Sequence, residues 1–115
     1  MKKKLFNEFS EYAVYELIHE EKQYPEYSNL ILKLKNKDGK TLSIMFENAL
    51  RFDFDSIGKI FIENIYEIES NEFLEKFLSV YFISIPIEHG FKNFSALSVD
   101  DGCFLKVVAQ KCYSI

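Results

Sequence analysis

The feature that most constrains the fold is a run of alternating apolar residues on either side of the pair Asp38-Gly39. A repeat of two is that of a β-strand, and two such runs joined by a short polar turn with glycine are typical of a β-hairpin. The sequence from residue 28 to residue 54 therefore predicts antiparallel strands. The alternating apolar residues are Leu30, Leu32 and Leu34 before the pair, and Leu42, Ile44 and Phe46 after it.

The length of this turn follows from the faces of the two strands. A two-residue loop would pair Leu34 with Ser43 and mix apolar with polar side chains, whereas a three-residue loop pairs Leu34 with Leu42. Since a shift of one residue moves a whole strand to its other face, the three-residue loop is favoured. It is the type I turn followed by a glycine bulge, with Gly39 in the left-handed conformation.

The same reasoning predicts a second hairpin around Gly102. A three-residue loop would set Val99 opposite Cys103 and Leu97 opposite Leu105, so that odd-numbered residues from 95 to 109 form one apolar face. Cys103 is then expected to be a small buried residue on the inner face of this hairpin.

Further strands are predicted on both sides of the first hairpin. The even-numbered apolar pattern continues past Phe46 to residue 54, with Asn48 as its one polar break, which implies a long or bent strand. Another strand runs to residue 68 and is interrupted by Asn64, and residues 12–20 fit an edge strand.

A helix is predicted over residues 70–80, because Ser70 or Asn71 can cap it and Glu72 lies in its first turn. Apolar residues then recur at helical spacing from residue 73 to residue 81. The predicted fold class is α+β: an antiparallel sheet of about six strands packed with one main helix near residues 70–80. The 115 residues are too few for two ordinary domains, so we expect a single domain, 1–115.

Hydrophobic residues make up 48% of the chain, which is more than one sheet face needs. The residues left over must be covered by the helix and the N-terminal segment, or by a partner. A homodimer made through a sheet edge or through this second apolar face is one alternative. They include Ile31, Met45, Phe61 and Ile65.

Cofactors and nucleic acid are not expected. His19 and His89 are the only histidines, and no spacing typical of zinc ligands occurs, so no metal site or other cofactor is predicted. The formal net charge of -4 argues against nucleic acid. We expect Cys103 and Cys112 to be reduced thiols of a cytoplasmic protein, with no secretion signal and no membrane partner.

Two enzymatic or ligand-binding alternatives remain open. His89 and Cys103 could form a nucleophilic pair of a small hydrolase, and Asn48 with Asn64 could line a ligand pocket. A buried structural cysteine is the simpler explanation of Cys103.

An acidic run suggests a surface that binds a cationic protein partner. No basic residue occurs between Glu63 and Glu75, and we expect Asp53 and Asp55 to lie on the neighbouring strand. Complementary charge accelerates association and adds specificity, although most such runs are simply solvated faces. The candidate partner-binding residues are Asp53, Asp55, Glu63, Glu67, Glu69, Glu72 and Glu75.

The layout also resembles small single-domain bacterial immunity-type proteins of polymorphic toxin systems. The resemblance lies in residues 27–30, the hairpin at Asp38-Gly39, the triplet 46–48 and the closing segment 101–109. It implies a cytosolic protein that binds and blocks a cognate toxin and has no catalytic residues. We therefore expect a non-enzymatic bacterial binding protein.

Overall fold

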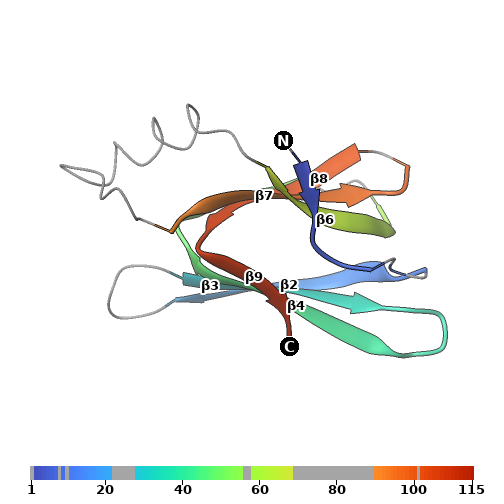
Figure 1. The fold of residues 1–115 in the computed structure, drawn as a ribbon. Helices are drawn as coiled ribbons and strands as arrows, with labels where there is room; N and C mark the ends of the chain where they lie inside the picture. Colours follow the sequence, from blue (N-terminus) through green and yellow to red (C-terminus); the bar gives the residue numbers. More distant parts are fainter. Residues whose placement is uncertain are drawn as a thin grey trace.

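The computed structural model describes residues 2–7, 9, 11–21, 28–55, 58–68, 90–100 and 102–115, and its regular structure in these ranges consists of β-strands. One antiparallel sheet has the order β1-β6-β7-β8-β5, with the strands Lys2–Lys4, Ile62–Ile68, Lys92–Ser98, Gly102–Ala109 and Arg51–Phe54. The other has the order β2-β3-β4-β9, with the strands Ala13–Glu21, Ser28–Lys35, Thr41–Ala49 and Lys111–Ser114. The two sheets form two layers (Figure 1).

The predicted α+β class is therefore wrong: the described residues form an all-β fold with two sheets. The segment 70–80, in which the main helix was predicted, lies outside the described residues. The single six-stranded sheet is replaced by sheets of five and four strands. Alternation shows which face of a strand is apolar, but it does not show which sheet the strand joins, because strand pairing is set by residues distant in the sequence.

The core lies between the inner faces of the two sheets. Leu30, Leu32, Leu34, Ile44 and Phe46 of the four-stranded sheet are completely buried. The opposite layer supplies Ile62, Ile65, Phe94, Leu105 and Val107. Phe46 and Phe94 contact each other edge to face across the interface, with ring centroids 6.0 Å apart. Two inner faces that interdigitate in this way form the core of a β-sandwich.

The first hairpin is confirmed in strands, loop length and register. Leu34 pairs with Leu42, and the pairs Leu32–Ile44 and Leu30–Phe46 follow as predicted. Gly39 has a φ of 83°, the left-handed conformation that the bulge requires. The Asn36 side chain adds support, because its Oδ1 atom accepts hydrogen bonds from the backbone of Asp38 and Lys40.

The second hairpin exists, but its predicted register is wrong, and its predicted inner face is confirmed only for Leu105, Val107 and Ala109 of β8. On β7 the core residues are the even-numbered Phe94 and Ala96. Leu97 pairs with Cys103, and a bulge then brings Leu105 opposite Ala96. Val99 is 62% exposed and Cys103 is exposed, so neither lies in the core. The physical reason is that β8 is apolar on both faces, with Phe104 and Leu105 both buried, so alternation does not select one register.

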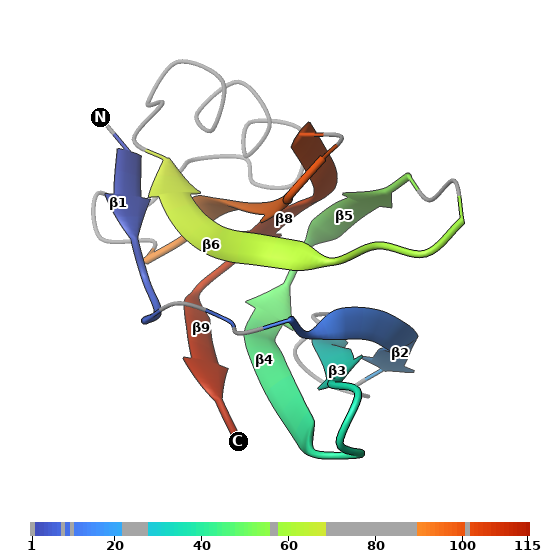
Figure 2. The same ribbon diagram turned by 90° about the vertical axis from the view of Figure 1, so that its right-hand side faces the viewer.

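The polar break at Asn48 marks a corner of the sandwich. The ribbon of β4 with β9 continues as the ribbon of β5 with β8, and both strands change layer at the same place (Figure 2). Asn48 has a φ of 55°, and its Nδ2 atom donates a 2.8 Å hydrogen bond to Oε1 of Gln110. The backbone pairing persists on both sides, from Gln110 N to Glu47 O and from Leu50 N to Val108 O. Sandwich corners are commonly made by strands that switch sheets in this way.

The N-terminal segment crosses between the layers at another corner. β1 pairs with the end of β6, and β2 begins beside the start of β6, where Val14 N donates to Ile60 O at 2.9 Å. Between these points the fully buried Asn64 hydrogen bonds to the backbone N and O of Phe6, at 3.3 and 2.9 Å. The predicted edge strand at residues 12–20 is confirmed as β2, at the edge of the four-stranded sheet.

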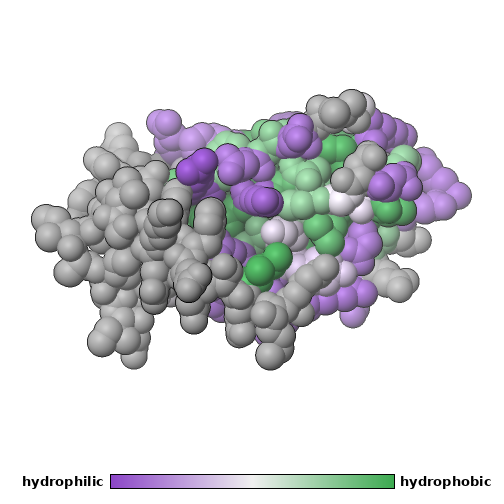
Figure 3. Space-filling view, turned by 90° about the horizontal axis from the view of Figure 1, so that it is seen from above, coloured by the Kyte–Doolittle hydropathy of each residue, from purple (hydrophilic) through white to green (hydrophobic). Residues whose placement is uncertain are grey.

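The apolar residues in excess of one predicted sheet face, Ile31, Met45, Phe61 and Ile65, occupy three different positions in the fold. Ile65 is completely buried in the core, whereas Phe61 is 38% exposed. Ile31 and Met45 are half-buried on the outer side of the four-stranded sheet, in a cross-strand row with Ile18 and Tyr113. The opposite layer also shows hydrophobic surface in the middle of its outer face (Figure 3).

Within the described ranges, no helix is long and apolar enough to cross a membrane.

The corner predicts an unequal response to two substitutions of Asn48. Asn48→Gly removes the side-chain hydrogen bond but tolerates positive φ, so it should lower the free energy of unfolding by about 1 kcal/mol. Asn48→Ala loses the same bond and adds left-handed strain, for a total of about 2 kcal/mol. Urea unfolding measures both values. Equal losses for the two variants would show that the backbone conformation at this corner is not a constraint.

Candidate functional site

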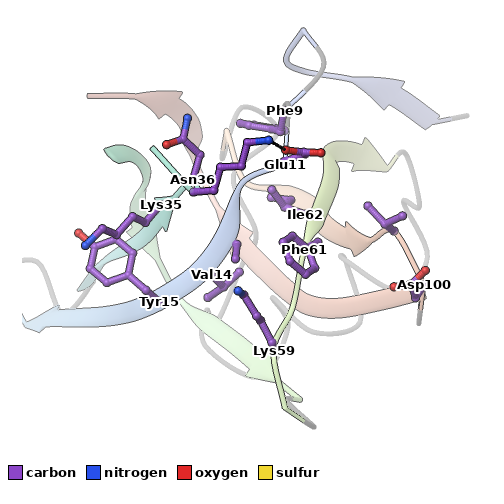
Figure 4. Close-up of a pocket in the computed structure, with 13 residues that line it drawn as sticks. Phe9, Glu11, Val14, Tyr15, Lys35, Asn36, Lys59, Phe61, Ile62 and Asp100 are labelled. Carbon is purple, nitrogen blue, oxygen red and sulfur yellow. Dashed lines mark ion pairs between the residues drawn. The ribbon is translucent and has the colours of Figure 1, made fainter. Parts of the chain in front are cut away.

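A groove of about 700 Å³ opens where β2 and β6 begin (Figure 4). It is lined by residues 9, 11, 13–15, 35–37, 59, 61–62 and 99–100, which come from both layers and from the turns after β3 and β7. Its volume lies within the range of roughly 300–1,000 Å³ that is typical of ligand sites. We refer to this set of residues as the groove.

Backbone pairing between separate segments forms the floor of the groove. Ala13 forms an antiparallel bridge with Phe61, and hydrogen bonds from Val14 N to Ile60 O and from Ile62 N to Tyr12 O flank this bridge. On the other side, the backbone N–H of Val99 donates to Phe61 O at 2.9 Å. The floor is thus held by main-chain bonds and does not depend on the exposed side chains above it.

Exposed apolar side chains gather at the groove. Of the six exposed large hydrophobic residues in the described part of the chain, three line it: Tyr15 at 48%, Phe61 at 38% and Val99 at 62%. Tyr15 is the extra residue of a bulge between Val14 and Glu16. Bulges redirect side chains and are frequent beside functional sites. Exposed apolar residues that cluster in this way are typical of an interaction surface.

Charged side chains surround these apolar residues. Lys59 places its Nζ atom 5.0 Å from the centre of the Phe61 ring, within the range of a cation–π interaction. Lys37 lies 3.4 Å from the carboxylate of Glu11. Glu11 has a φ of 54°, a conformation that is uncommon for a residue with a side chain. Lys35 and Asp100 complete the charged lining.

The predicted acidic residues do not all lie together. Glu63 and Glu67 are on β6, whereas Asp53 is on β5 and Asp55 follows that strand, and β7 and β8 separate β5 from β6. The expectation that Asp53 and Asp55 lie on the strand next to Glu63 is therefore wrong. Three of the seven candidates, Glu69, Glu72 and Glu75, lie outside the described residues.

Several of these carboxylates have partners within the chain. Glu67 forms an ion pair with Lys92 at 3.2 Å, and Asp53 lies 3.7 Å from Arg51. Glu63 accepts a 2.8 Å hydrogen bond from the hydroxyl of Tyr66, and this bond raises the pKa of Tyr66.

Of the residues of the enzymatic and ligand-binding alternatives, the structure describes Cys103, Asn48 and Asn64. His89 lies outside the described residues, and Cys103 is exposed on β8, where its thiol points to the carbonyl of Leu105 at 3.5 Å. Asn48 and Asn64 hold two different corners through hydrogen bonds. Among the described residues, no group of three or more histidine, cysteine, aspartate or glutamate side chains is placed to hold a metal ion.

Sequence reasoning missed most of the groove, because it is assembled from short segments that are far apart in the chain. The sequence did mark Phe61, because it is among the apolar residues in excess of one predicted sheet face. Tyr15 reaches the groove through a bulge, which alternation does not reveal. Val99 was assigned to the inner face of a hairpin whose register differs.

Comparison of the chain with protein-family models, with curated proteins and with solved structures found no match.

The two cysteines should differ in reactivity. Both are free thiols, but Cys103 is exposed, whereas burial raises the pKa of Cys112 to about 12. Because the thiolate is the reactive form, we expect iodoacetamide at about pH 8 to alkylate Cys103 in the native chain and to modify Cys112 only slowly. Mass spectrometry of time points measures both rates. Cys103→Ser is the control, and equal rates at the two sites would contradict the burial of Cys112.

Proposed function

We propose that the chain is a non-enzymatic binding protein that recognises a partner protein through the groove. The observation that carries this proposal is the gathering of Tyr15, Phe61 and Val99, all substantially exposed, over a floor of paired backbone. Aromatic residues at the centre of an interface commonly supply most of its binding energy. A floor that is already ordered lowers the entropic cost of association.

The arrangement of polar groups favours a protein partner. Charged side chains border the exposed apolar residues, which matches the apolar centre and polar rim of protein interfaces. An immunity-type role, in which the chain covers a cognate toxin, is one form that such binding would take. The groove is preferred to the acidic residues as the docking face, since Glu67 and Asp53 have basic neighbours within the chain.

The proposal predicts that partner capture depends on the groove. The full chain is immobilised and exposed to a lysate of its source organism, and retained proteins are quantified by mass spectrometry. Loss of a central interface anchor costs about 2 kcal/mol or more, so Phe61→Ser should reduce retention of the partner by roughly 10-fold or more. Val99→Asp should also reduce it, and this exposed turn residue can be replaced without affecting the core.

The matched control is Ile31→Ser, which removes a half-buried apolar side chain from the outer side of the four-stranded sheet. It should retain the partner as the unmodified chain does. If every protein retained by the unmodified chain is also retained by both groove variants, the groove is not the docking site.

A further inference from the structure

The charge of the groove differs from that of the chain as a whole. The chain has 18 acidic and 14 basic residues and a net charge of -4. The groove is lined by three lysines, Lys35, Lys37 and Lys59, and by two acidic residues, Glu11 and Asp100. A net acidic protein thus has an excess of basic residues at the place where its apolar side chains are exposed.

The charges within the groove are also unevenly distributed. Glu11 and Lys37 form an ion pair at 3.4 Å, so each largely offsets the charge of the other. Lys35 and Lys59 remain on the side of Tyr15, and Asp100 lies away from them, beyond Phe61 (Figure 4). The positive end and the aromatic side chains therefore lie together, and Lys59 extends toward the space between Tyr15 and Phe61 (Figure 4).

We infer that the groove binds an acidic peptide segment that carries an aromatic or aliphatic anchor, an inference that rests on the proposed function. The anchor contacts Tyr15 and Phe61, and the carboxylates of the segment face Lys35 and Lys59. Charge complementarity of this kind adds specificity and accelerates association. Asp100 disfavours acidic residues at the opposite end, which sets the direction in which the segment lies.

Single-stranded nucleic acid is the competing ligand, since it also combines negative charge with stacking bases. The groove fits it less well. Glu11 and Asp100 would lie close to a continuous phosphate backbone, whereas a peptide can place its carboxylates only where lysines face them.

The test is selection of peptides from a random library displayed on phage, with the immobilised full chain as bait. Recovered sequences should be enriched in aspartate and glutamate next to an aromatic or large aliphatic residue. Their affinity, measured by fluorescence anisotropy, should fall by about 10-fold or more in the double variant Lys35→Glu, Lys59→Glu. The difference should shrink between about 0.05 M and about 0.5 M salt, because ions screen exposed charges.

The matched control is the double variant Lys106→Glu, Lys111→Glu, which makes the same change of net charge at exposed positions away from the groove. It should leave the affinity of the selected peptides within about 2-fold, since screening weakens charges at a distance. An unlabelled single-stranded oligonucleotide, added as competitor, should not displace the peptides.

The outcomes separate this inference from the proposed function. Peptides that require Phe61 but are basic or neutral, or that tolerate the groove charge reversal, overturn the acidic chemistry and leave the docking groove intact. Displacement by the oligonucleotide assigns the groove to nucleic acid instead. Failure to recover any peptide that requires Phe61 overturns both proposals.

Discussion

The two-layer arrangement depends on how the backbone passes from one sheet to the other without losing its hydrogen bonds. At the corner of Asn48 and Gln110, two long strands bend together, and main-chain bonds continue on both sides of the bend. Buried backbone groups must be paired, so a bend inside the sandwich is possible only if the groups it frees find other partners. The side-chain carbonyl of Asn29 supplies one such partner, because it accepts a hydrogen bond from Asn48 N at 3.2 Å. The side chains of Asn48 and Gln110 bond to each other across the bend.

The first hairpin and the two polar breaks show what the sequence could predict. Leu30 to Phe46 presents one clean apolar face, so its register could be determined by alternation alone. Asn48 and Asn64 were recognisable as interruptions of strands, and each proved to hold a corner. That the chain changes sheet at Asn48, and that Asn64 holds the N-terminal segment between the sheets, was not predictable, because the partners of each strand lie far away in the sequence. The predicted register of β8 was wrong for a local reason, because this strand has apolar residues on both of its faces.

The candidate site was less predictable than the fold, because nearness in sequence is a poor guide to nearness between sheet positions. The acidic run suggested one lobe, but Asp53 and Glu63 lie on strands separated by two others, about 14 Å apart at the usual strand spacing. In the groove, conversely, residues that are distant in the sequence lie close together in the fold. Tyr15, Phe61 and Val99 are far apart in the chain, yet a bridge and one backbone hydrogen bond bring their segments together.

The groove separates the part that must be ordered from the part that recognises a partner. Its floor is made of backbone bonds around Phe61, and these bonds tolerate different side chains as long as the strands remain paired. Its exposed residues come from a bulge at Tyr15, from the turn at Val99 and from the start of β6, where side chains contribute little to the core. Changes at these positions therefore alter the chemistry of recognition at small cost in folding stability, since exposed substitutions usually change stability by about 0.5 kcal/mol or less. The corners held by Asn48 and Asn64 lack this freedom, because the buried Asn64 amide satisfies the backbone of Phe6 and the half-buried Asn48 amide bonds to the side chain of Gln110.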